Sequence, residues 1–224
     1  MGSQQRDAAL KDYGAWQAQA LPNVTGYSAP QFESLKTLGD NIGHFPLLSG
    51  NSATMLQSGD ETYPAMLAAI EQAQESIVLQ TYIFDHDREG VKLAEALERA
   101  LHRGVIIRVL IDAVGSKYSR PPMIRLLRKK RIPCALFMTN PLGMKMPYAN
   151  LRSHRKILVV DGKIGFTGGM NIREGFVKAI AGNNATRDTH FCFEGPIVAQ
   201  LMAVFAHDWR FTTRETLPVD EWGN

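Results

Sequence analysis

The chain has 224 residues, of which 45% are hydrophobic and 21% are charged, and its formal net charge is +3. This composition is that of a globular protein with a proper core, which excludes a generally disordered chain, and the small positive charge does not by itself indicate a nucleic-acid-binding protein. Two cysteines form no disulfide framework, so a reducing compartment is expected. No apolar stretch approaches the roughly 20 residues that span a bilayer, and the first residues contain no signal-peptide core.

Regular hydrophobic patterns begin after residue 51. Residues 1–51 mix Pro, Gly, Asn and Ser with weak periodicity, and we predict an irregular arm there with one short helix around Gln31 to Leu38. We predict a single domain over residues 52–224. An upstream membrane anchor is left open by the sequence.

Helical and strand-like patterns alternate through the first part of this domain. Apolar residues at helical spacing over 63–74, 90–104 and 121–131 are each followed by a β-branched or apolar run of strand length, over 76–85, 105–115 and 134–138. A loop over 139–151, a strand pair, a strand over 188–195 and a helix over 196–209 complete the pattern. Such alternation predicts an α/β sandwich with a mostly parallel central sheet.

Positive charge is concentrated in the middle of the chain. No acidic residue lies between Asp112 and Asp161, whereas this segment contains Lys117, Arg120, Arg125, Arg128, Lys129, Lys130, Arg131, Lys145, Arg152, Arg155 and Lys156. This asymmetry indicates an electropositive surface for an anionic partner such as phosphate, nucleic acid or acidic lipid. The cluster from Arg125 to Arg131, taken alone, is equally compatible with a solvated helix face.

The segment NLRSHRKILVVDGKIGFTGGMN, residues 150–171, combines chemistry with a hairpin pattern. Side chains two apart on a strand share a face, so His154 and Lys156 can address one phosphate together, the imidazole as nucleophile or acid and the ammonium as counter-charge. Asp161 cannot join them on that face. The Asp161–Gly162 pair is a two-residue hairpin signal, which favours a turn or support role for Asp161 over direct catalysis.

A glycine corner follows the second strand of this hairpin. Gly168 and Gly169 allow a close backbone approach, and Asn171 offers an amide donor where the strand ends. These residues fit a phosphate-binding corner, although a capped glycine-rich turn is the simpler interpretation when His154 and Lys156 are left out of account.

These residues resemble the signature of the phospholipase D superfamily. His154, Lys156 and Asp161 have its H-x-K-x-x-x-x-D spacing, and Gly168, Gly169 and Asn171 occupy the G-[SG]-x-N positions that follow. The hairpin and four further segments (TYIFDHDREG, RGVIIRVLIDAVGS, RDTHFCFEGPIV and FAHDW) are similar to the first catalytic half of bacterial cardiolipin synthases, over residues 55–209. The resemblance implies a phospholipase D-like α/β/α sandwich.

The resemblance also implies roles for individual residues. His154 would attack a phosphodiester to give a phosphohistidine, and Lys156 and Asn171 would hold the non-bridging oxygens, without a metal or other cofactor. A neutral imidazole nucleophile needs its other nitrogen held, and Asp188 is the candidate for that task, although a strand-start aspartate is equally compatible with a plain turn. Glu194 is a weaker candidate, and His190 fits an interior or rim position better than a catalytic one.

The chain carries one such motif, whereas phospholipase D chemistry uses two histidines around one pocket. Three explanations stay open: the first half of a longer two-motif enzyme, a homodimer that joins two copies of His154, and a non-catalytic phosphate- or membrane-binding domain. The resemblance favours the first, a phosphatidyltransferase that acts on an anionic, phosphatidylglycerol-like phospholipid at the bacterial inner membrane surface. The alternative enzyme is a homodimeric phosphodiesterase that cleaves nucleic acid.

Overall fold

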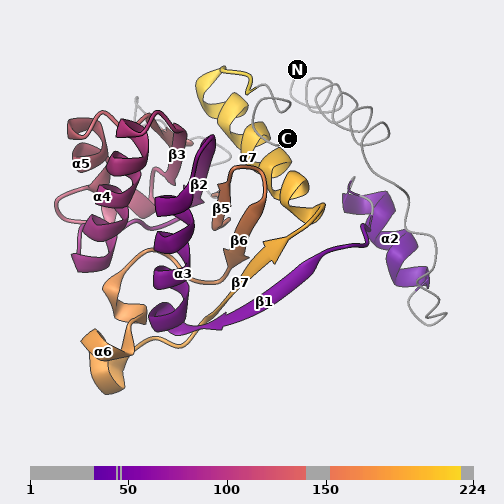
Figure 1. Ribbon diagram of the computed structural model, residues 1–224, viewed down its shortest axis with the longest axis horizontal. Coiled ribbons are helices and arrows are strands. Elements are labelled where there is room, and N and C mark those ends of the chain that lie inside the picture. Colours follow the sequence, from indigo (N-terminus) through magenta and orange to yellow (C-terminus); the bar gives the residue numbers. More distant parts are fainter. Residues whose placement is uncertain (1–32, 44, 46, 140–151, 218–224) are drawn as a thin grey trace, which may run out of the picture.

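A computed structural model describes residues 33–43, 45, 47–139 and 152–217. Residues 1–32 of the predicted arm and nearly all of the predicted loop over 139–151 lie outside these ranges. In chain order the elements are α2 (Glu33–Gly43), β1 (Ser52–Gln57), α3 (Ser58–Gln72), β2 (Ser76–Thr81), α4 (Arg88–His102), β3 (Ile106–Asp112), η2 (Gly115–Lys117), α5 (Met123–Lys129), β4 (Cys134–Phe137), β5 (Ile157–Val160), β6 (Ile164–Gly168), η3 (Glu174–Phe176), α6 (Lys178–Ala181), η4 (Gly182–Asn184), β7 (Thr189–Glu194) and α7 (Ile197–Thr213) (Figure 1).

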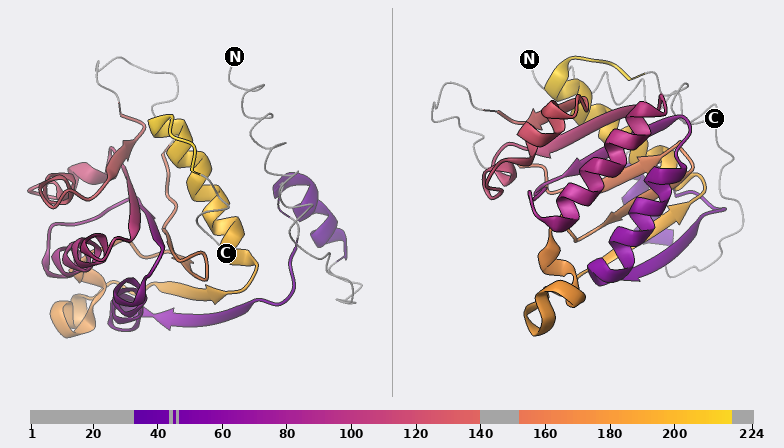
Figure 2. Two further views of the ribbon diagram at one scale, coloured as in Figure 1. Left: turned by 45° about the horizontal axis from the view of Figure 1, so that its top comes forward. Right: turned by 60° about the vertical axis from the view of Figure 1, so that its left-hand side comes forward.

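The strands form one seven-stranded sheet in the order β1-β7-β6-β5-β2-β3-β4. Helices α3, α4 and α5 cover one face and α7 covers the other, which Figure 2 shows from two directions. The predicted α/β/α sandwich is therefore confirmed. The two faces have separate cores, in which Leu158 and Val160 point toward the α3–α5 side and Ile157 and Val159 point toward α7.

The resemblance to the phospholipase D superfamily implied a mixed central sheet, which is confirmed, but the expectation that this sheet would be mostly parallel is wrong. Only the β2–β3 and β3–β4 pairings within the described sheet are parallel, whereas the pairings β1–β7, β7–β6, β6–β5 and β5–β2 are antiparallel. The physical reason is the short hairpin between β5 and β6, because a strand that returns through a tight turn pairs antiparallel with the strand before it. Parallel pairing is confined to the strands that are linked through α4 and α5.

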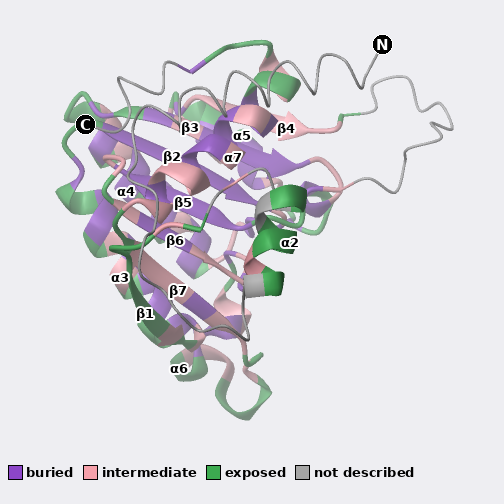
Figure 3. Cartoon of the chain, turned by 90° about the vertical axis from the view of Figure 1, so that its right-hand side faces the viewer, coloured by how far each residue is buried: buried purple, intermediate pink, exposed green. Residues whose placement is uncertain are grey.

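Two details at the amino-terminal end differ from the sequence expectations. Helix α2 runs from Glu33 to Gly43 and so extends beyond the predicted end at Leu38, and β1 was not predicted at all. All but one of the β1 residues are exposed, and Figure 3 shows this strand in green along the edge of the sheet. An edge strand without an apolar face carries little hydrophobic alternation, so its sequence gives a weak strand signal. The domain boundary at residue 52 coincides with the start of β1 and stays a prediction.

Candidate active site

The hairpin of β5 and β6 contains Asp161 in its turn. Val160 pairs with Ile164, so the loop has one residue more than a two-residue hairpin, and both Asp161 (φ 51°) and Gly162 (φ 62°) have left-handed backbone conformations. The Asp161 carboxylate accepts hydrogen bonds from the backbone N–H groups of Gln74, Glu75 and Ser76, each at 2.9 Å. Asp161 thereby ties the hairpin to the connection between α3 and β2. This placement agrees with the predicted support role, which stays a prediction.

The residues before β5 form a strap, Arg152–Lys156, that carries the chemical pair. The strap is not part of the sheet, because β5 begins at Ile157. Its Ser153 donates its backbone N–H to Asp112 Oδ2 at the end of β3, at 3.2 Å. Asp112 is 1% exposed, and its other oxygen accepts the N–H groups of Val114 and Gly115. The buried end of β3 therefore fixes the backbone immediately before His154.

His154 and Lys156 lie in direct contact. Lys156 Nζ is 3.1 Å from His154 Nδ1 and donates a second hydrogen bond to the His154 carbonyl oxygen at 2.7 Å. His154 is exposed, whereas Lys156 is 6% exposed, and burial lowers the pKa of Lys156 against the opposing effect of the Asp188 charge. An ammonium has no acceptor, so a hydrogen bond from Lys156 to Nδ1 requires the His154 tautomer whose ring proton resides on Nε2.

Tyr82 forms the wall of the site beside this pair, and sequence reasoning missed it. Its ring centroid is 4.4 Å from that of His154, and Lys156 Nζ lies 5.9 Å from the same ring. Tyr82 directly follows β2, at the carboxyl end of that strand, where the strap leads into the neighbouring strand β5. The aromatic run TYIF carries strand propensity, so nothing in the sequence marks this tyrosine as a site residue.

The glycine corner packs tightly against the start of β7. Gly168 pairs with His190, and a Cβ at Gly168 would lie 2.6 Å from the His190 Cα atom. A Cβ at Gly169 would lie 2.1 Å from Asp188 Oδ1. Side chains are therefore excluded at both positions unless their neighbours move, and the absence of one at Gly169 leaves the space that the Asp188 carboxylate occupies.

Asp188 and Asn171 border the same corner. The Asp188 carboxylate accepts the N–H of Thr189 at 2.7 Å, and its charge acts on Lys156 and His190. Within the described residues no hydrogen bond joins Asp188 to His154, so its orienting role stays a prediction. Asn171 Oδ1 accepts the N–H of Ile83 at 3.1 Å, which directs its Nδ2 donor to the opposite side of the amide.

The two weaker candidates lie in different environments. Glu194 is exposed at the far end of β7, away from the corner at which β7 begins. His190 is 0% exposed, and neither ring nitrogen has a hydrogen-bond partner in the described part of the chain. Burial lowers the pKa of His190 from its ordinary value of 6.5 to about 4, with Asp188 opposing this shift and Lys156 adding to it.

The buried imidazole of His190 predicts acid lability. Between pH 6.5 and about 4 the unfolded chain binds a proton that the folded chain does not, so the free energy of unfolding is retained above this window and falls as the pH decreases through it. The total loss is about 3 kcal/mol. Urea titrations across this range should give a shallower pH slope for His190→Leu, whereas a change at the exposed His102, His102→Gln, should keep the wild-type slope. An unchanged slope in His190→Leu would contradict the prediction.

A positively charged rim borders the site beyond Tyr82. The rim loop, residues 115–122, carries exposed Lys117 and Arg120 on either side of Tyr118, whose ring is 6.5 Å from Tyr82 and which is 64% exposed. Because no acidic residue occurs between Asp112 and Asp161, the rim loop carries net positive charge next to Tyr118, which contacts Tyr82.

Comparison with known proteins places this site in a family. A family model described as "Cardiolipin synthase, PLD-like domain" matches residues 66–209, which is more than half of the chain and includes every residue of the predicted site. The chain belongs to this family. This match, together with the cardiolipin synthases described in the next paragraph, confirms the family resemblance that was proposed from the sequence.

Individual relatives show how much of a family member the chain represents. Cardiolipin synthase A of Pseudomonas putida is 33% identical over 204 residues, covering 91% of this chain and 42% of that protein. Cardiolipin synthase of Geobacillus thermodenitrificans is 35% identical over 194 residues, covering 87% of this chain and 39% of that protein. The chain thus spans about two fifths of the length of these relatives.

Solved structures support the fold. The crystal structure of a phospholipase D family member, Nuc from Salmonella typhimurium, superposes with a TM-score of 0.55 at 19% identity and covers 71% of this chain and 95% of that one. At this identity the likeness concerns the fold alone. Within the described residues no helix has the length and apolarity needed to cross a membrane.

Proposed function

We propose that this chain is the first catalytic half of a phosphatidyltransferase of the cardiolipin synthase type. The observation that carries the proposal is the contact of His154 Nδ1 with Lys156 Nζ, at 3.1 Å, in a domain of the cardiolipin synthase family. A nucleophile and a buried cation at one point suit phosphodiester chemistry, in which a bond to phosphorus forms while negative charge develops on the non-bridging oxygens.

The proposed reaction has two displacements at phosphorus. In the first, a ring nitrogen of His154 bonds to the phosphorus of a phosphatidylglycerol-like donor, and the bond from phosphorus to the headgroup oxygen breaks. The leaving glycerol takes a proton from an acid on the second motif. In the second, a hydroxyl of another phospholipid bonds to phosphorus, the N–P bond breaks, and the hydroxyl proton returns to that same group. No oxidant, metal or cofactor enters this balance.

Lys156 links substrate binding to the state of His154 in this proposal. The described contact leaves the ring proton of His154 on Nε2, whereas attack by Nε2 requires an unprotonated Nε2 and a held Nδ1–H. A phosphodiester that enters the site competes for the Lys156 ammonium, because a charge-assisted hydrogen bond to a phosphate is stronger than one to a neutral imidazole. Nδ1 then takes up a proton from solvent while Nε2 gives up its proton to solvent, so the ring stays neutral, and Asp188 at the adjoining corner is the carboxylate that we assign to hold the Nδ1–H.

Asn171 and the glycine corner complete the phosphate site. The Nδ2 donor of Asn171 is oriented by the Ile83 amide. Gly168 and Gly169 lack a Cβ where His190 and Asp188 pack, so we assign to them the close packing of β7 that brings Asp188 to this corner. Asp161 is assigned to support, because its carboxylate is occupied by three backbone donors of the α3–β2 connection. The second histidine of the complete site comes, in this proposal, from a second motif in a longer native chain rather than from a second copy.

The rim loop supports an anionic lipid surface as the partner. Its two exposed cations and its exposed Tyr118 combine the charge that attracts an acidic headgroup with an aromatic ring suited to the membrane interface. The domain would then work at the bacterial inner membrane surface.

A product assay tests the proposed function. Protein expressed from the complete native reading frame is incubated with vesicles of labelled phosphatidylglycerol, and the lipids are separated. We expect a diphosphatidyl lipid and free glycerol, in amounts that fall when phosphatidylcholine dilutes the anionic lipid. Cleavage of DNA without any lipid product would instead favour the phosphodiesterase alternative, and a lack of both products would favour a binding domain.

A further inference from the structure

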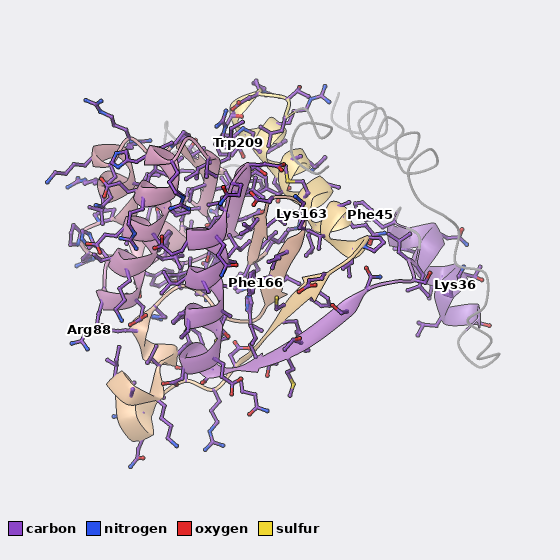
Figure 4. All side chains as sticks on the ribbon, viewed as in Figure 1. Lys36, Phe45, Arg88, Lys163, Phe166 and Trp209 are labelled. Atoms are coloured by element: carbon purple, nitrogen blue, oxygen red, sulfur yellow. The ribbon has the colours of Figure 1, made fainter. Side chains whose placement is uncertain are left out.

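Asp208 is a buried carboxylate that the proposed chemistry does not use. It lies on α7 between Phe205 and Trp209, which belong to the apolar core on that face of the sheet, and it is 4% exposed (Figure 4 labels its neighbour Trp209). A charge in such a place costs several kcal/mol, of the order expected for a buried ion, unless partners compensate it. An apolar side chain would suit the packing of α7 better, so the partners of Asp208 indicate what it is for.

These partners lead directly to His154. Asp208 Oδ2 accepts hydrogen bonds from Arg155 Nη1 at 2.5 Å and from Gln80 Nε2 at 2.7 Å. Arg155 follows His154 in the strap. The same Gln80 Nε2 donates to Ser153 Oγ at 2.8 Å, and Ser153 precedes His154. One carboxylate is thus connected to the residues on both sides of His154.

The arrangement follows from strand parity. Arg155 has the same parity as Ile157 and Val159, whose side chains pack toward α7, so its guanidinium meets α7 while His154 and Lys156 are directed to the other side. Gln80 lies on β2 and is 1% exposed. Two hydrogen bonds hold Ser153: its hydroxyl accepts from Gln80, and its backbone N–H donates to Asp112. The strap itself has no sheet pairing, so these side-chain bonds take the place of a strand ladder.

We propose that Asp208 is a positioning residue that fixes the strap on both sides of His154, through Arg155 on one side and through Gln80 and Ser153 on the other. Its effect on catalysis rests on the proposed function, but its effect on the geometry of His154 does not. The other oxygen of its carboxylate, Oδ1, lies 3.4 Å from His207 Nδ1, so this contact uses a different oxygen from the hydrogen bonds that lead to the strap.

The matched control is Glu215. Its carboxylate also accepts from an arginine and a neighbouring side chain, Arg108 Nη2 at 2.6 Å and Trp209 Nε1 at 2.8 Å, and so ties the end of α7 to β3, with no hydrogen bond to the strap among the described residues. Glu215→Gln therefore reports what the loss of an arginine–carboxylate tie at the end of α7 does to stability, although the Glu215 side chain is 41% exposed and that of Asp208 is 5% exposed. Asp208→Asn keeps the shape and one acceptor for Gln80 but removes the charge that holds Arg155.

The first test needs no lipid substrate. Nitrogen-15 imidazole spectra of the isolated chain should give one discrete neutral tautomer for His154 in wild type and in Glu215→Gln. In Asp208→Asn the His154 signals should broaden or split, and the Ser153 and Arg155 amides should exchange with solvent at least about tenfold faster. Arg155→Gln is a second route if Asp208→Asn does not fold, because that side chain is 51% exposed and a glutamine amide can still donate a hydrogen bond to the Asp208 carboxylate. Wild-type spectra and exchange in a folded Asp208→Asn or Arg155→Gln protein would overturn the proposal.

The second test measures lipid transfer with protein from the complete reading frame. Asp208→Asn and Arg155→Gln should each lower kcat about 100-fold with little change in KM, since a displacement near 1 Å at the nucleophile has that effect. The double variant should be no worse than the more impaired single variant, because the two act as one unit. Glu215→Gln should retain kcat within about twofold of wild type. Equal losses of kcat in Glu215→Gln and Asp208→Asn would reduce Asp208 to a purely structural residue, whereas an inactive wild type would count against the proposed function alone.

Discussion

Replacing His154 by alanine is expected to lower lipid transfer by at least about 10⁴-fold, because the removal of a covalent nucleophile costs far more than the removal of a binding contact. The melting temperature should stay within about 3 °C of wild type. The side chain is exposed, and the contacts recorded for it in the described structure are those with Lys156 and the Tyr82 ring. The measurement is the product assay on anionic vesicles, combined with a thermal melt of the same preparation.

The control for this variant is His102→Ala. His102 is another exposed histidine, in the last turn of α4, and it belongs to no part of the proposed site. Its replacement should leave both transfer and melting temperature unchanged. Residual transfer by His154→Ala at more than a tenth of the wild-type rate would remove the covalent role of His154.

The replacement of Asp161 by asparagine is expected to have its main effect on stability. An amide retains one acceptor oxygen, but its NH₂ group meets a backbone N–H that the carboxylate accepted, so a charge-assisted hydrogen bond becomes a contact between two donors. The free energy of unfolding should fall by about 2 kcal/mol, and the melting temperature by about 4–8 °C. Transfer, measured well below the melting temperature, should stay within about threefold of wild type.

Lys163→Gln is the comparison for this change. Lys163, which Figure 4 labels, occupies the same turn. Its ion pair with Glu75, at 3.5 Å, is exposed on both sides. Such pairs contribute little, so its loss should cost less than about 0.5 kcal/mol. If Asp161→Asn lost transfer as completely as His154→Ala while it unfolded like wild type, the support role of Asp161 would be wrong.

Most elements were predictable because their signals are local. The repeat of Leu93, Leu97 and Leu101 at a spacing of four residues predicts a helix, and the apolar run of β3 predicts a buried strand, without reference to the rest of the chain. The hairpin was likewise predictable from Asp161 and Gly162, although its register leaves one more residue in the loop. The proportion of parallel and antiparallel pairing was not predictable, because it depends on which strands become neighbours in the sheet. Strand β5, for example, lies between β6 and β2.

The candidate site likewise contains residues that a local pattern predicts and residues that only the fold brings together. His154 and Lys156 could be proposed from their spacing, since the chemistry needs both within one short extended segment. Gln80 lies on β2, Tyr82 directly follows β2 and Asp208 lies on α7, so these residues reach the strap only through the fold. Gln80 and Asp208 lie within segments that have ordinary strand and helix patterns, so no local pattern predicts the polar network that joins them.

The central claim, that His154 becomes covalently bonded to phosphorus, has one direct test. Protein from the complete reading frame is mixed with labelled phosphatidylglycerol vesicles, denatured in alkali within the first turnover, digested and analysed by mass spectrometry. We predict a phosphatidyl or phosphoryl group on the peptide that contains His154, absent from His154→Ala and present in His102→Ala. An active protein whose adduct maps to a different histidine, or that forms no adduct at any time point, would contradict the account.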